Sequence, residues 1–185
     1  MAEYYLISQL PSLDGISENT PLPISEERFI ELCNQFLSKK LQTAIGELTL
    51  LPSKSIESSG SAFIDSWNES ERTLRFALGK VRAEKMKKSF DTENRIFPME
   101  YIKAASTAIE ISNPMEAEKY LNNYRLEILE AIRPMDSFSE DYIFYYGLKL
   151  KLLLRIRQFD TNDGEKAYKN IYNSILNGDR LEAKQ

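Results

Sequence analysis

The residues that could do chemistry gather in the stretch 67–88, which reads WNESERTLRFALGKVRAEKMKK and has the period of an amphipathic helix. At about 100° per residue, Trp67 shares one helical face with a stripe of apolar residues. Glu71, Arg75 and Arg82 fall along one edge of that face. Residues at such an edge lie where a helix meets its neighbours. The spacing therefore predicts a buried or half-buried ionic network.

Charged residues beside later apolar stripes extend the same pattern. Glu118 and Arg125 lie on the shoulder of one stripe, and Arg155 and Arg157 lie in another apolar segment. Arginine and glutamate at such positions could pair between helices. Two interpretations stay open: a charge-paired seam that fixes helix register and helps to bind a partner, or solvated shoulders whose aliphatic stems lie along apolar surface.

Residue types that serve common enzyme chemistry are scarce in this sequence. It has no histidine, the commonest general base and metal ligand, and its seven glycines form no phosphate-binding loop. The single cysteine, Cys33, lies on an apolar helical face and is expected in the core. Residues 160–165 begin like a calcium loop, but Gly164 and Ile171 occupy its fifth and twelfth positions, so a turn is expected. We expect no catalytic, cofactor-binding or metal-binding residue and no enzyme; a carboxylate pair converging in a cleft is the enzymatic alternative.

The composition indicates a globular chain with an acidic balance: 42% of residues are hydrophobic and the net charge is −4. Because there is no basic surplus to neutralise phosphates, nucleic acid is not expected as a partner. The apolar run near the N-terminus is too short for a signal sequence or a membrane span, so a cytoplasmic protein is expected. The length suits a single helical domain over residues 1–185, with 1–90 and 91–185 as alternative sub-lobes.

Helical periodicity dominates the chain, apart from residues 4–10, which read either as a short extended segment or as a first short helix. Helices are expected to begin near residues 25, 38, 61, 98, 113, 139 and 162, with caps at Ser25, Asn113 and Ser139. The segment 142–159 is apolar on more than one side, which places it in the middle of the domain. The last helix, 162–176, is expected to turn Ile171, Tyr172 and Ile175 inward. The prediction is all-α: an irregular bundle of about six to eight helices with two long central helices.

A set of short motifs resembles the bacterial domain-of-unknown-function family 2764, whose genes sit within operons for V/A-type ATPases. The motifs occur in order along most of the chain: YYLISQLPSL at 4–13, PLPISEERFIELC at 21–33, W-x3-E-x2-LR-x-AL-x-K-x-RA at 67–83, NP-x2-AE at 113–118 followed by Arg125, Phe138-Ser139, YGLKL at 146–150, then Arg155 and Gly164. Each motif alone is weak, and their order and spacing carry the resemblance.

The resemblance implies a non-catalytic helical component of the V/A-type ATPase, similar to its C-type subunit, the all-helical funnel that joins the rotor shaft to the membrane ring. It implies other ATPase subunits as partners, contact with the membrane only through them, and a location at the cytoplasmic face of the inner membrane. Structural or partner-interface residues would then be Trp67, Glu71, Arg75, Arg82, Glu118, Arg125, Tyr146 and Arg155. The alternative is a free-standing helical interaction module, for which the ten tyrosines would suit a contact surface.

Overall fold

The computed structural model describes residues 2–16, 20–53, 58–91, 97–158, 169 and 171–172. This part of the chain contains seven helices and no strand: α1 (Ala2–Gln9), α2 (Glu26–Phe36), α3 (Lys39–Gly46), α4 (Ala62–Lys85), α5 (Met99–Glu110), α6 (Pro114–Ala131) and α7 (Glu140–Arg157). The all-α prediction is confirmed, and the helices described here fall within the expected number.

Local capping sets where these helices begin. Each of the three predicted cap residues accepts a hydrogen bond from a backbone N–H in the first turn of its helix: Ser25 from Arg28, Asn113 from Met115 and Ser139 from Tyr142. Ser38, where a helix was expected to begin, caps α3 in the same way by accepting from Leu41. The cap oxygen satisfies one of the four N–H groups that have no partner inside the helix. Helix starts are thus decided by residues within about one turn of the boundary.

The N-terminal segment is a helix and not an extended strand, so that alternative for residues 4–10 is wrong. Leu6 is fully buried, and Ile7 and Leu10 pack against the same hydrophobic cluster. Spacings of three and four residues put these side chains on one helical face, whereas an extended segment would alternate them between two faces. The helix α1 is thereby anchored on α2.

The last predicted helix, 162–176, lies outside the described residues except at 169, 171 and 172, as does the calcium-loop-like segment 160–165. Ile171 and Tyr172 are exposed, so the expectation that they face inward is wrong. The spacing of apolar residues shows which side chains share a face, but it does not show whether another element covers that face.

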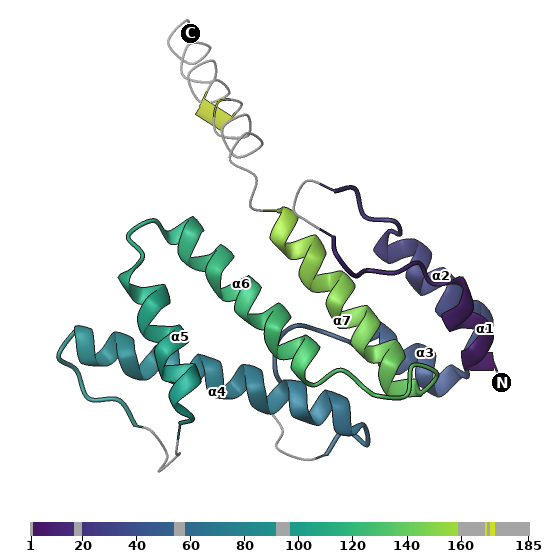
Figure 1. Ribbon diagram of the computed structural model, residues 1–185, viewed down its shortest axis with the longest axis horizontal. Coiled ribbons are helices and arrows are strands. Elements are labelled where there is room, and N and C mark those ends of the chain that lie inside the picture. Colours follow the sequence, from purple (N-terminus) through teal and green to yellow (C-terminus); the bar gives the residue numbers. More distant parts are fainter. Residues whose placement is uncertain are drawn as a thin grey trace, which may run out of the picture.

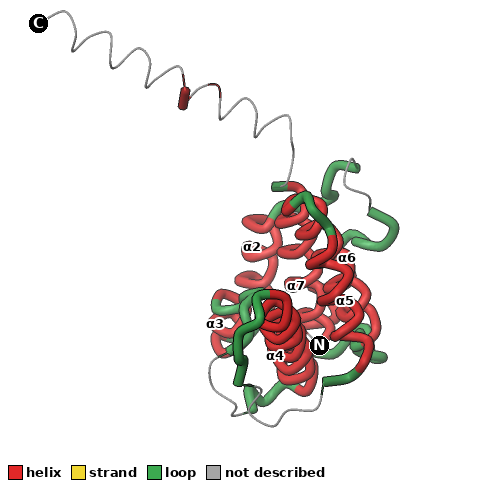
Figure 2. The backbone as a smooth tube through the Cα atoms, turned by 90° about the vertical axis from the view of Figure 1, so that its left-hand side faces the viewer, coloured by secondary structure: helices red, strands yellow, loops and turns green. Residues whose placement is uncertain are grey.

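Helix α7 is the central element, as its sequence predicted. Its buried residues run continuously from Ile143 to Leu150. Figure 2 shows α7 between α2 and α3 on one side and α5 and α6 on the other. Gly147 permits a close approach of α7 to its neighbours, because a Cβ added there would lie 2.9 Å from Leu48 Cδ2 and 3.2 Å from the Phe29 ring.

The buried side chains form two hydrophobic clusters. The first lies among α1, α2, α3 and α7, and the second lies between the later turns of α4, α5 and the first turns of α6. Helices α4 and α6 run through both clusters, and α5 lies at the opposite end of the molecule from α1–α3 (Figure 1). Along α4, Trp67 belongs to the first cluster and Leu74 to the second; along α6, Leu129 belongs to the first and Leu121 to the second.

Candidate functional site

A buried carboxylate lies where α4 passes from one hydrophobic cluster to the other. The side chain of Glu71 is only 1% exposed. Its Oε2 accepts a hydrogen bond from Arg125 Nε at 3.0 Å, and its Oε1 accepts from Arg125 Nη2 at 3.2 Å and from Arg75 Nε at 2.8 Å. Two arginines from two different helices therefore neutralise one carboxylate, and the arrangement joins α4 to α6.

Arg125 extends these contacts toward α7. Its side chain is 8% exposed, and its Nη1 donates to Asn122 Oδ1 at 3.0 Å and lies 3.5 Å from Glu118 Oε1. The same Glu118 oxygen accepts a hydrogen bond from Arg155 Nη2 on α7 at 2.6 Å. We call this group the ionic layer; it consists of Glu71, Arg75, Glu118, Asn122, Arg125 and Arg155.

The ionic layer has a buried centre and a solvent-facing edge. Glu71 and Arg125 lie at the centre, whereas the side chains of Arg75 and Arg155 are partly exposed. Removing two charges from water is expensive, and their attraction can fail to compensate that cost. The clearest effect of these ion pairs is to fix helix register. The charged groups on α4, α6 and α7 can pair only when the three helices have the axial positions that bring the partners together.

The structure gathers five of the eight predicted residues in this layer and places the other three elsewhere. Trp67 is buried one turn before Glu71, and its indole N–H has no hydrogen-bond partner among the described residues. Arg82 is exposed and forms no ion pair within the described part of the chain. It shares the helical edge of Glu71 but lies 11 positions, or about 16 Å, further along α4. Tyr146 lies beside a second polar cluster, which surrounds Lys149.

A second polar cluster surrounds a buried lysine on α7. Lys149 is 7% exposed, and its Nζ lies 2.6 Å from Asp14 Oδ1, 2.6 Å from Glu130 Oε1 and 3.1 Å from Tyr145 Oη. Asp14 comes from the loop after α1, so this lysine ties residues 135 positions apart. The sequence signal was a charged residue inside a segment that is apolar nearly all round, where a lysine needs partners.

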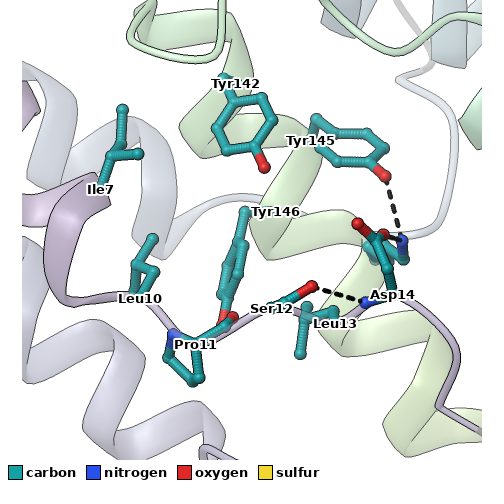
Figure 3. Close-up of a pocket in the computed structure, with 10 residues that line it drawn as sticks. Ile7, Leu10, Pro11, Ser12, Leu13, Asp14, Tyr142, Tyr145 and Tyr146 are labelled. Carbon is teal, nitrogen blue, oxygen red and sulfur yellow. Dashed lines mark hydrogen bonds and ion pairs between the residues drawn. The ribbon is translucent and has the colours of Figure 1, made fainter.

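A cavity of about 170 Å³ adjoins this lysine. Figure 3 shows Tyr142 and Tyr145 on one side of it, Ile7 and Leu10 on the other, and residues 11–14 along its floor. Tyr146 Oη donates a hydrogen bond to the carbonyl oxygen of Pro11 at 2.9 Å, which fastens the loop to α7. The segment that follows α1 therefore forms one wall of the cavity.

The pKa values of Lys149, Asp14 and Tyr145 indicate which charge state each side chain of this cluster holds near neutral pH. Burial alone would lower the pKa of the Lys149 ammonium, but its hydrogen bonds to Asp14, Glu130 and Tyr145 raise it above its usual range. The hydrogen bond from Lys149 in turn lowers the pKa of Asp14. Burial raises the pKa of Tyr145 to about 12. Lys149 stays charged and Tyr145 neutral near pH 7, which is the opposite of what an amine nucleophile or a tyrosine base needs.

Neither a membrane-spanning helix nor a metal-ligating cluster occurs in the part of the chain that the structure describes. No described helix is both long enough and apolar enough to cross a membrane. No group of three or more histidine, cysteine, aspartate or glutamate side chains in the described segments could hold a metal ion.

The fold and these contacts define the class: an all-α protein whose buried charged groups join helices to one another. The chain carries a domain of the family described as Protein of unknown function (DUF2764), which matches residues 90–179. This range contains α5, α6 and α7, and with them Glu118, Arg125, Lys149 and Arg155. The family resemblance is thus confirmed over that part of the chain. No curated protein and no solved structure matches the sequence.

Proposed function

We propose that this chain is a non-catalytic helical component of a bacterial V/A-type ATPase, similar in role to the C-type subunit that couples the rotor shaft to the membrane ring. The observation that carries the proposal is the DUF2764 domain at residues 90–179, together with the ordered motifs that resemble the same family from residue 4 onward. The resemblance implies a gene placed among ATPase genes, and this implication is what points to the ATPase as the assembly.

The use of the buried charges supports a structural role. Glu71, the most deeply buried carboxylate of the ionic layer, accepts three hydrogen bonds from two arginines, so neither of its oxygens is left open to a substrate. Lys149 is likewise held as a cation between two carboxylates. A protein that transmits force between partners needs helices that do not slide past one another. These ion pairs fix the positions of α4, α6 and α7 along their axes.

The partners in this proposal are the other subunits of the ATPase, at its central shaft and membrane ring. The protein would lie at the cytoplasmic face of the inner membrane and reach the membrane only through those partners.

The test is affinity purification of the tagged chain, expressed from its own locus in the native bacterium and extracted in mild detergent. We expect the catalytic, shaft and ring subunits to be recovered with it and identified by mass spectrometry. A tagged catalytic subunit, purified in parallel, shows whether the complex survived extraction. Recovery of an intact ATPase through that control, with none through this chain, would refute the proposal. Recovery of one unrelated protein instead would favour the free-standing interaction module.

A further inference from the structure

Three aromatic side chains form an exposed cluster at the end of the molecule that holds the N-terminus. We call it the aromatic patch; it consists of Tyr4, Tyr5 and Phe138. These side chains are 55%, 58% and 50% exposed, respectively. The Tyr4 and Phe138 rings stack with centroids 4.8 Å apart, and the Tyr5 ring meets Tyr4 edge-on at 6.1 Å. Contact between rings from α1 and from the α6–α7 connection makes one continuous aromatic surface.

The backbone below Phe138 is held in place. Asp136 Oδ1 accepts a hydrogen bond from the Phe138 N–H at 2.9 Å, and Ser139 Oγ donates to the Asp136 carbonyl oxygen at 2.7 Å. Ser139 also caps α7. On the other element, Leu6 is fully buried and anchors α1. The aromatic patch is therefore preorganised, and a partner would bind it without first ordering it.

The charges beside the aromatic patch are acidic. Asp136 and Glu140 flank Phe138 in the sequence, and both are exposed. Arg133, a half-buried cation on the same connection, contacts groups of the fold itself. Its guanidinium carbon lies 5.3 Å from the centre of the Tyr145 ring, and its Nη1 lies 3.7 Å from Asp14. A ligand approaching the aromatic rings consequently meets negative charge around them.

We propose that the aromatic patch docks a basic amphipathic helical segment of another protein in the assembly. This inference rests on the function proposed above and assigns to it a surface and a partner chemistry. Apolar side chains at spacings of three and four on such a helix would contact the three rings. Lysine or arginine beside them would pair with Asp136 and Glu140. Exposed, rigid tyrosine and phenylalanine side chains are residues on which binding energy concentrates.

The acidic charge beside the aromatic patch also disfavours two other occupants, an anionic membrane and a second copy of this chain. Anionic lipid headgroups would meet the acidic side chains unfavourably. A second copy bound patch to patch would bring like charges together. Both remain measurable alternatives.

The experiment repeats the native purification with three double variants. Y4S with F138S removes the ring stack, and D136N with E140Q removes the two acidic groups while keeping an oxygen acceptor at position 136 for the Phe138 N–H. The matched control, M86S with M99S, removes two exposed apolar side chains carried by α4 and α5, at the end of the molecule away from α1 (Figure 1). Because all these side chains are exposed or only half-buried, each variant should fold, which far-UV circular dichroism and the thermal midpoint verify.

We expect the ring-stack variant to recover at least about tenfold less ATPase per tagged chain. The charge variant should lose severalfold, and its recovery should depend less on salt than that of the parent. The control should stay within about twofold of the parent.

Equal recovery by the parent and the ring-stack variant would overturn this inference while leaving the proposed function intact. If the parent recovers no ATPase, the proposed function fails and this inference fails with it. Two measurements on the purified chain complete the test. Binding to phosphatidylglycerol–phosphatidylethanolamine vesicles, lost in the ring-stack variant, would assign the patch to the membrane. Dimerisation lost in that variant would assign it to a second copy. Either result would overturn the assignment to a basic helix.

Discussion

The buried pair of Glu71 and Arg125 gives the most direct test of the structural reasoning. In R125M, the Glu71 carboxylate stays buried and keeps only one of its three hydrogen bonds, the one from Arg75. Asn122 Oδ1 also loses the hydrogen bond that Arg125 Nη1 donates to it. Removing one partner of a buried ion pair costs about 3–5 kcal/mol. We expect R125M to lower the free energy of unfolding by that amount.

The double variant E71L with R125M should be much less damaged than the sum of its two single variants. It removes both charges, and Arg75 can turn into solvent because its side chain is already partly exposed. The remaining cost is the unpaired Asn122 amide, about 1–3 kcal/mol. If E71L alone costs about 3 kcal/mol, the coupling energy of the cycle should exceed about 2 kcal/mol in magnitude.

Urea unfolding followed by tryptophan fluorescence measures these free energies. Trp67 is the single tryptophan of the chain and lies buried one turn from Glu71. The control is R28M, which breaks the exposed i,i+3 pair with Glu31 and should change stability by less than about 0.5 kcal/mol. A loss below about 1 kcal/mol in R125M, with coupling below about 0.5 kcal/mol, would mean that the pair behaves as if in solvent, and the buried layer would be refuted.

Three further outcomes are expected. Lys149 holds the pKa of Asp14 below its ordinary 3.8, so the contribution of this carboxylate to folding stability is present above pH 3.8 and is lost as the pH falls through the lower folded pKa. In a plot of the urea midpoint against pH, D14N should therefore show a smaller fall at acid pH than the parent, and parallel curves would contradict this. G147A should destabilise the protein by about 1 kcal/mol because of crowding, whereas G46A, where an added Cβ has nothing within 4 Å, should stabilise it by about 0.5 kcal/mol; urea unfolding that gives both the same sign would argue against the close approach. Burial raises the pKa of Cys33 to about 12, so iodoacetamide should label the native thiol at least about a hundredfold more slowly than the urea-unfolded one, and comparable rates would place Cys33 at the surface.

Much of the fold follows from the sequence because helix formation is decided locally. Caps such as Ser25 and Asn113 act within one turn, and apolar periodicity identifies the inner face of each helix. The same logic identified the central position of α7 and the edge of α4 on which Glu71 lies. These inferences need only the residues within a few positions of each site.

What the tertiary structure decided is which of these local features meet. Glu71 and Arg125 are 54 positions apart, and Lys149 and Asp14 are 135 apart. A helical wheel records the angle of a residue but not the height at which another helix packs, so Arg82 shares an edge with Glu71 and takes no part in the ionic layer. Likewise, the N-terminal segment is helical because Leu6 finds a buried site on the assembled core. Capping and periodicity depend on neighbours in sequence, whereas ion pairing and burial depend on neighbours in space, and those exist only after the helices have packed.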